Sequence, residues 1–129
     1  MINNKFDLII PIYNEGENLV NLFNHLKVSI NYQYRILLCY DNDNDDVFDY
    51  LEILKKIDDK FLLVKNKYHG ACGAIKSGFE FSNEFECKIV YPADDLINAT
   101  IIDQMYEKFL EGYDIVAPSR FMKGGNMIG

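Results

Sequence analysis

Two adjacent carboxylates, Asp94 and Asp95, follow a short apolar segment at residues 88–91, with only Pro92 and Ala93 between. Such a segment is typical of a buried strand, and side chains just beyond its C-terminal end face the crevice where open α/β sheets bind ligands. Two neighbouring carboxylates repel each other unless a cation lies between them, and Mg²⁺ is typically held by one or two carboxylates plus substrate phosphates. The pair therefore predicts a metal site for a phosphorylated ligand. An Asp-rich turn that caps the next helix is the alternative.

Other residues that can do chemistry also follow predicted strands. Tyr13 can stack on a base or a ribose, or it is an exposed loop residue. Asp41 can accept a hydrogen bond from a ring N–H of a nucleobase, which uracil and guanine both offer. Gly70 either allows close approach of the backbone to a ligand or caps a turn. Arg120 can clamp a diphosphate with two hydrogen bonds, or it forms a surface ion pair.

The acidic segment at residues 41–46 has a second interpretation, a calcium-binding loop. Carboxylates occupy positions 1, 3, 5, 9 and 12 of an EF-hand pattern, at Asp41, Asp43, Asp45, Asp49 and Glu52. However, Asp46 stands where that loop needs a glycine, and residues 35–40 have the pattern of a strand instead of an incoming helix. We therefore favour a strand-end role for Asp41 and interpret residues 43–46 as solvated turn and cap residues.

Strand and helix patterns alternate along the chain. Apolar segments predict strands at residues 6–12, 34–40, 61–64, 88–91 and 114–117, and helical spacing predicts helices at residues 19–30, 47–57, 71–79 and 102–109. Asn14 and Glu17 have the spacing of a capping box for the first helix. The alternation predicts an α/β fold with a mostly parallel sheet and helices on both faces. We expect residues 1–129 to form one part of a larger domain that is truncated at the C-terminus.

Composition and charge exclude some classes of protein. The chain has 49% apolar and 26% charged residues, which is typical of a globular protein. Its net charge of −7 argues against a nucleic-acid-binding surface, which needs a basic stripe. No apolar run is long enough to span a membrane. The three cysteines are irregularly spaced, so we expect reduced thiols in a cytoplasmic protein.

Several segments together resemble the family 2 glycosyltransferases, which have the GT-A fold, a Rossmann-like fold. Ile10-Pro11-Ile12-Tyr13-Asn14-Glu15 is similar to the family's opening strand and loop, and Asp41 and Asp46 match its Asp-Asp-Gly-Ser-x-Asp segment. Pro92-Ala93-Asp94 lies where an Asp-x-Asp motif is usual, with Pro92 in place of the first Asp and with Asp95 following. Residues 119–125 are similar to a segment of the polyprenyl-phosphate branch, which includes the dolichol-phosphate-mannose synthases. The resemblance covers nearly the whole chain.

The resemblance implies transfer of a sugar, with inversion, from a UDP- or GDP-sugar donor with the help of Mg²⁺ or Mn²⁺. It implies that Pro11, Tyr13, Glu15 and Asp41, with Gly70 nearby, bind the nucleoside; that Asp94 and Asp95 hold the metal; and that Arg120 assists the leaving phosphate. The acceptor would be a lipid phosphate or a saccharide. A phosphate acceptor needs no general base, whereas a hydroxyl acceptor needs a carboxylate from outside this chain. The protein would then be peripheral at the membrane through parts outside this chain.

Three alternatives have different requirements. A signalling receiver domain needs an aspartate at the end of the third strand and a lysine at the end of the fifth, where this chain has Lys65-Asn66 and Ser119-Arg120. A sugar-phosphate nucleotidyltransferase needs a glycine-rich basic N-terminal loop, which the sequence lacks. A non-catalytic module that binds a metal or a nucleotide stays open.

Overall fold

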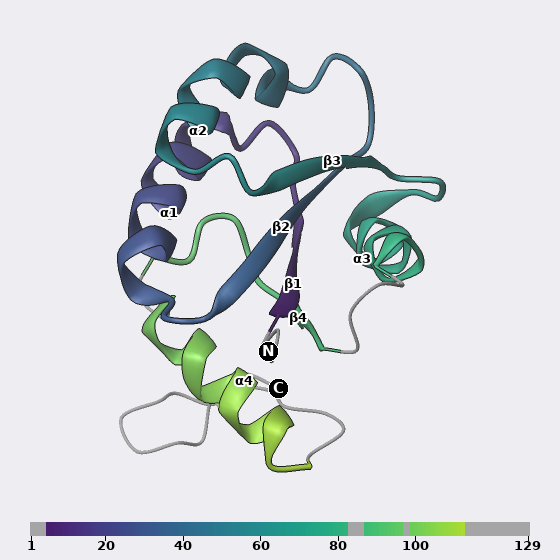
Figure 1. Ribbon diagram of the computed structural model, residues 1–129. Coiled ribbons are helices and arrows are strands. Elements are labelled where there is room, and N and C mark those ends of the chain that lie inside the picture. The colour runs from purple at the N-terminus through teal and green to yellow at the C-terminus, as the bar shows by residue number, and fades with distance from the viewer. Residues whose placement is uncertain (1–4, 83–86, 97–98, 113–129) are drawn as a thin grey trace.

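The computed structural model describes residues 5–82, 87–96 and 99–112. Within them, strands and helices alternate as predicted (Figure 1). The strands are β1 (Lys5–Pro11), β2 (Gln33–Tyr40), β3 (Phe61–Lys65) and β4 (Lys88–Val90). The helices are α1 (Gly16–Ser29), α2 (Leu51–Ile57), α3 (Gly70–Phe81) and α4 (Ile102–Leu110), with 3-10 turns η1 (Asp46–Asp49) and η2 (Ala99–Ile101). The predicted strand at residues 114–117 lies outside the described residues.

The described strands form one parallel sheet in the order β3-β2-β1-β4. This is the beginning of the Rossmann strand order, and it differs from the order 2-1-3-4-5 of flavodoxin-like folds, which include receiver domains. The order therefore counts against the receiver alternative. Strand order reverses between β1 and β4, and ligands of open α/β sheets bind at the carboxyl ends of the strands at such a point. The predicted α/β, Rossmann-like fold class is confirmed.

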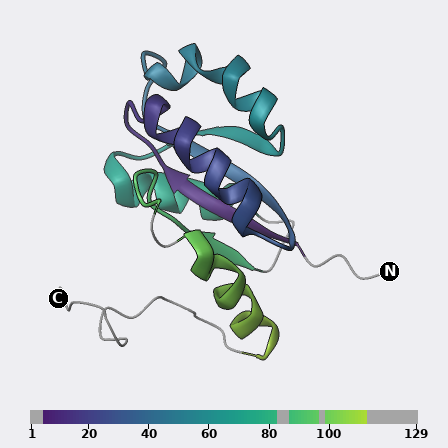
Figure 2. The same ribbon diagram turned by 90° about the vertical axis from the view of Figure 1, so that its left-hand side faces the viewer.

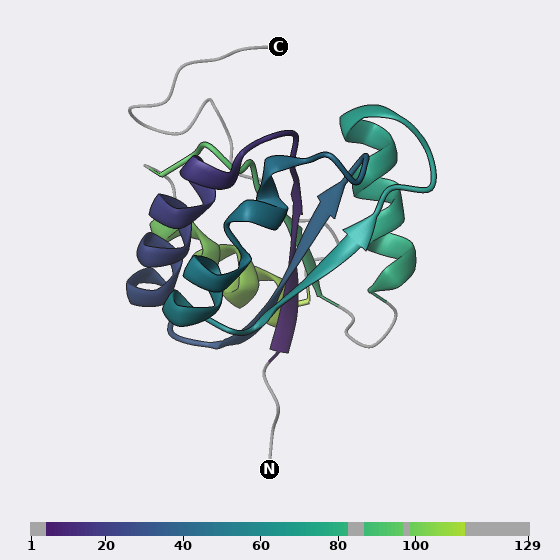
Figure 3. The ribbon, with the colours of Figure 1, turned by 90° about the horizontal axis from the view of Figure 1, so that it is seen from above.

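Helices cover both faces of the sheet, as expected (Figure 3). The main core lies on the face covered by α1, α2 and α4, where alternate β1 residues Phe6, Leu8 and Ile10 are fully buried. In the view from the side of α1 and α2, α4 lies further along the same face (Figure 2). The opposite face carries α3 and a smaller cluster of buried residues: Ile9, Leu37, Cys39, Val64 and Ala74.

Small residues let α3 lie close to the sheet. A Cβ atom added at Gly78 would be only 2.6 Å from Cγ2 of Ile9 and 3.0 Å from Sγ of Cys39. Real Cβ atoms do not approach neighbours so closely, because protein interiors are already packed to crystal-like density. A glycine here therefore fixes the depth at which α3 packs, and with it the position of the helix N-terminus above the strand ends.

The start of α1 differs from the predicted capping box. The N-cap of α1 is Glu15, and no side chain of α1 caps it. Instead, the N–H of Gly16 donates to Oδ1 of Asp46 at 3.0 Å. Asn14 has a positive φ of 53°, and its side-chain oxygen accepts a hydrogen bond from the N–H of Asp46. The capping-box prediction is wrong because a partner about thirty residues away in sequence satisfies these groups.

The predicted helix at residues 47–57 is divided into η1 and α2. Asp45 begins η1 by accepting a hydrogen bond from the N–H of Val47, and the chain leaves helical geometry at Tyr50, with φ of −109° and ψ of 1°. The ring of Tyr50 lies so close to Gly16 that no Cβ atom would fit there. The division between η1 and α2 thus coincides with the contact between Tyr50 and the start of α1. The spacing of apolar residues alone could not predict this contact.

Candidate functional site

A cavity of about 290 Å³ opens at the carboxyl edge of the sheet, where ligands of this fold bind. The end of β1 and the loop after it, the residue after β2, and the first turns of α3 form its walls. Its lining residues are Pro11, Ile12, Tyr13, Glu15, Asp41, Gly70, Ala71 and Ala74. The fold therefore brings the five residues predicted to bind a nucleoside (Pro11, Tyr13, Glu15, Asp41 and Gly70) together around a single space.

The loop between β1 and α1 is held in place by the acidic segment. Asp45 is buried, and its Oδ2 accepts a hydrogen bond from the N–H of Asn14 at 3.0 Å. Together with the Asp46 bonds described above, this contact fastens the loop at Asn14 and at Gly16. Tyr13, in that loop, leaves 67% of its surface exposed, so its ring is free to receive a planar ligand group. Glu15 is half-buried and accepts a hydrogen bond from Nδ2 of Asn18 at 2.7 Å.

The prediction of solvated turn and cap residues at 43–46 is confirmed for Asp43, which is exposed, and for Asp45 as a cap, of η1. It is wrong on the solvation of Asp45, which is buried. The side chains of Asp45 and Asp46 accept hydrogen bonds from backbone N–H groups of the loop after β1 and the start of α1, and Asp43 forms an ion pair with Lys65. The segment also follows β2 instead of a helix. The EF-hand interpretation therefore does not match the structure, because Asp45 has its oxygens occupied by backbone N–H groups and an EF-hand loop needs an incoming helix.

Asp41 is joined to the start of α3 through one buried side chain. Nδ2 of Asn66 donates to Oδ1 of Asp41 at 2.6 Å and to the carbonyl oxygen of Gly70 at 3.1 Å. Oδ2 of Asp41 has no hydrogen-bond partner among the described residues. Gly70 has a φ of +74°, a backbone conformation that residues other than glycine rarely adopt. The cavity thus presents one free carboxylate oxygen beside a backbone turn that requires glycine.

Asp94 and Asp95 occupy a turn after β4, and β4 pairs with β1. Tyr91 anchors this turn: its N–H donates to the carbonyl oxygen of Ile9, and its hydroxyl donates to the carbonyl oxygen of Asp95 at 2.7 Å. Burial, followed by the nearby charge of Asp95, raises the pKa of Tyr91, so the hydroxyl keeps its proton for this bond. The turn therefore lies at the same edge of the sheet as the cavity, although neither aspartate lines it.

The sequence model of the family described as "Glycosyl transferase family 2" matches residues 7–127. The chain belongs to glycosyltransferase family 2. The resemblance stated from the motifs is confirmed, and the parallel, Rossmann-like sheet agrees with the GT-A fold that it implied.

Relatives of this family 2 chain have informative names. The chain is 28% identical over 124 residues to a dolichol-phosphate mannosyltransferase of Pyrococcus furiosus. This match covers 95% of the chain and 35% of the relative. The chain is 31% identical over 124 residues to an undecaprenyl-phosphate 4-deoxy-4-formamido-L-arabinose transferase of Proteus mirabilis, covering 91% of this chain and 37% of the relative. The predicted similarity to the polyprenyl-phosphate branch is confirmed. The chain spans little more than a third of the length of these two relatives.

The resemblance implies a divalent ion, and the side chains near the end of β4 show how such an ion could be bound. In residues 5–82, 87–96 and 99–112, no group of three or more His, Cys, Asp or Glu side chains converges as a metal site. Asp94 is exposed and Asp95 is half-buried. Mg²⁺ in phosphate-binding sites takes one or two carboxylates and completes its coordination with phosphate oxygens and water. The pair therefore fits an ion bound together with a diphosphate and does not fit an ion held by protein side chains alone. Arg120 lies outside the described residues.

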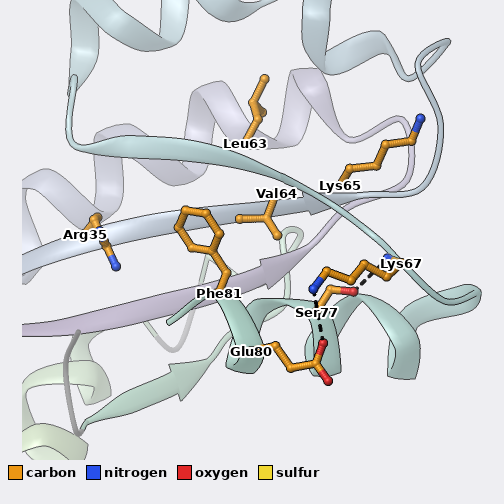
Figure 4. Close-up of a pocket in the computed structure, with 8 residues that line it drawn as sticks. All are labelled: Arg35, Leu63, Val64, Lys65, Lys67, Ser77, Glu80 and Phe81. Carbon is orange, nitrogen blue, oxygen red and sulfur yellow. Dashed lines mark hydrogen bonds and ion pairs between the residues drawn. The ribbon is translucent and has the colours of Figure 1, made fainter. Parts of the chain in front are cut away.

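A larger cavity, of about 550 Å³, lies between β3 and α3 (Figure 4). Among the described residues that line it, each cation is engaged in an ion pair: Arg35 with Asp7, Lys65 with Asp43, and Lys67 with Glu80. An anionic ligand would have to compete with these pairs. Of the predicted site residues that the structure describes, none lines this cavity, so its greater size does not make it the stronger candidate for the site of this family.

Sequence reasoning missed the residues that support the site. Asn66 directly follows β3, as Asp41 follows β2, so the rule that selected the strand-end residues applies to it equally. Asp45 and Asp46 gave no such signal, because nothing in their spacing identifies a backbone partner in another loop.

No helix in the described part of the chain has the length and apolar character needed to cross a membrane.

Proposed function

We propose that this chain binds the nucleotide-sugar donor of an inverting glycosyltransferase. The observation that carries the proposal is the cavity at the carboxyl edge, lined by Pro11, Tyr13, Glu15, Asp41 and Gly70. Family membership supports glycosyl transfer as the reaction. The names of the relatives support a polyprenyl phosphate as the acceptor, with a saccharide as the other possibility.

The nucleoside would occupy the cavity. Its volume of about 290 Å³ is at the lower end of the range for small-molecule sites, so the diphosphate and the sugar would extend beyond it along the strand ends. The free Oδ2 of Asp41 would accept the ring N–H of uracil or guanine, and cytosine lacks that proton at the equivalent ring nitrogen. Tyr13 would stack on the base or the ribose, and Gly70 would allow the backbone to approach the ligand.

The diphosphate would lie at the point where strand order reverses, between the loops after β1 and β4. Asp94, with Asp95, would hold Mg²⁺ or Mn²⁺ there, and such an ion stabilises the negative charge that develops on a leaving diphosphate. Arg120 would add a bidentate contact to the same phosphates. A polyprenyl phosphate is already an anion, so attack by it on the sugar would need no general base. We place the protein at the cytoplasmic side of a membrane as part of the same proposal.

Isothermal titration with UDP-, GDP- and CDP-sugars, with and without Mn²⁺, tests the proposal. We expect binding of a UDP- or GDP-sugar, tighter with Mn²⁺, and weak binding of the CDP-sugar. In Asp41→Asn the residue presents an amide N–H to the base, so the preferred base should change to cytosine. A hydrogen bond to a charged group contributes about 1.5–3 kcal/mol, so the affinity of the original donor should fall roughly tenfold to a hundredfold.

Asp43→Asn is the matched control, because it removes the same charge from the same loop without touching the cavity. Asp43 is on the surface and pairs with Lys65, so this variant should bind the donor as the wild-type protein does. The proposal is rejected if the folded wild-type protein binds none of these nucleotides, or if Asp41→Asn and Asp43→Asn weaken binding equally.

A further inference from the structure

We infer that Asn66 is a positioning residue for donor recognition: it orients the side chain at position 41 and joins it to the first turn of α3. The inference rests on the proposed function of the cavity. It concerns a residue that does not line the cavity and would not touch the donor.

Every hydrogen-bonding group of the Asn66 amide in the described structure has a protein partner. Nδ2 donates to Asp41 and to the carbonyl oxygen of Gly70, as given above. Oδ1 accepts from the N–H of Tyr68 at 2.8 Å and from Oγ of Ser77 at 3.1 Å. The side chain is buried, with 7% of its surface exposed. A buried amide with all its bonds made has one favourable orientation, because any other leaves polar groups unpaired.

The direction of these bonds is fixed by the chemistry of the partners. A backbone N–H only donates, so the atom facing Tyr68 must be the amide oxygen. A carboxylate and a backbone carbonyl only accept, so the atom facing Asp41 and Gly70 must be the amide nitrogen. Asn66 therefore presents a donor to position 41, and whatever side chain stands there must turn an acceptor atom toward it.

Packing holds the amide in this position as well. Gly73 lies against it: a Cβ atom there would be 3.2 Å from Oδ1 and 3.3 Å from Nδ2 of Asn66. Ser77, one helical turn further along α3, bonds both to Asn66 and to the N–H of Lys67. The amide is therefore enclosed between the end of β3 and α3. It leaves the second oxygen of Asp41 as the acceptor available to a base.

Base preference in an Asp41→Asn background tests this role directly. With Asn66 present, the oxygen of the new amide should face Asn66 and its N–H₂ should face the cavity, so CDP-sugar should bind about tenfold more tightly than UDP- or GDP-sugar. In Asp41→Asn/Asn66→Ala, the amide at position 41 can rotate and offer either group. The preference should then shrink to about twofold, since an amide that turns freely satisfies either base.

The control is Asp41→Asn/Asn24→Ala. Asn24 is exposed on α1 and bonds only within that helix among the described residues, so this variant should keep the cytosine preference. Equal base preference with and without Asn66 would overturn the inference while leaving the donor site intact. Failure of the wild-type protein to bind any nucleotide sugar would instead reject the proposed function, so the two failures are distinguishable.

A measurement on the wild-type protein covers the case in which the double variant does not fold. In ¹⁵N-labelled protein, the side-chain amide signals of Asn66 should move during titration with the UDP- or GDP-sugar that binds, and those of Asn24 should not. Unchanged Asn66 signals at saturation would also overturn the inference.

Discussion

Removing Arg35 should destabilise the protein without affecting donor binding. Arg35 and Asp7 are paired neighbours on β2 and β1 near the amino ends of the strands, remote from the cavity. Nε and Nη2 of Arg35 each donate to an oxygen of Asp7 at 2.8 Å, and Oγ of Ser82 donates to the same carboxylate at 2.5 Å. The carboxylate of Asp7 is fully buried, whereas the Arg35 side chain is 23% exposed.

The size of the effect follows from this asymmetry of burial. Breaking a buried ion pair by removing one partner typically costs about 3–5 kcal/mol, because an unpaired buried charge remains. Water reaches part of Arg35 and Ser82 still donates, so we expect a loss of about 3 kcal/mol in Arg35→Met, at the lower end of that range. With a urea m-value of about 1.5 kcal/mol/M, the unfolding midpoint should fall by about 2 M.

Urea unfolding of Arg35→Met beside Lys65→Met provides the comparison. Lys65 pairs with Asp43, and these side chains are 53% and 75% exposed. Removing Lys65 also deletes one positive charge, but an exposed pair contributes only about 0–1 kcal/mol. Both variants should keep the donor affinity of the wild-type protein at temperatures where they are folded. Equal losses of stability in the two variants would show that burial of Asp7 does not control the energy of this pair.

Two further predictions concern the loop contacts and the buried thiols. Asp45→Ala should lower the free energy of unfolding by about 1–2 kcal/mol, because it removes an N-cap, and should weaken donor binding several-fold because Asn14 loses its anchor; unfolding and titration measurements beside Asp43→Ala check this. Burial raises the pKa of Cys39 to about 12 and that of Cys87 to about 11. At a pH above the thiol pKa of the unfolded chain but below these raised values, each thiol is deprotonated in the unfolded state and protonated in the folded state. In this pH range the free energy of unfolding should therefore fall by about 1.4 kcal/mol per pH unit for each thiol. Urea midpoints measured between pH 8 and pH 11 should show a shallower decline in Cys39→Ala than in the wild-type protein.

The sequence was sufficient to predict that Tyr13, Asp41 and Gly70 gather at one cavity, whereas Asp94 and Asp95 lie at the same edge of the sheet without lining it. Parallel strands place their C-terminal ends at one edge, so each polar residue directly after an apolar segment could be assigned to that edge without knowledge of side-chain positions. The same geometry explains why Tyr13 and Asp41 belong together although 28 positions separate them (41 minus 13). The presence of the helices could likewise be predicted directly from the spacing of apolar residues.

Contacts between loops could not be predicted in this way. The backbone partners of Asp45 and Asp46 lie in the loop after β1, about thirty positions away, and local spacing carries no information about such a pairing. The local signal from Asn14 and Glu17 even favoured the wrong cap. Hydrogen bonds that depend on the distance between two loops are fixed only once the sheet has set that distance. For the same reason, the close contact of Tyr50 with Gly16 had no counterpart in the apolar pattern.

Asp7 on β1 and Asp41 directly after β2 show how the structure separates a supporting carboxylate from one that has an oxygen left for a ligand. Asp7 receives three side-chain hydrogen bonds and is fully buried, so it has little capacity left for a ligand. Asp41 is held by Asn66 at one oxygen, and in the described structure its other oxygen has no partner. Both residues are acidic, and charge alone does not distinguish them. Because a carboxylate can accept up to about four hydrogen bonds, the number already made within the protein measures what remains for a ligand. By this criterion Asp41, with one oxygen held and one without a partner in the described structure, is the carboxylate that we propose recognises the base.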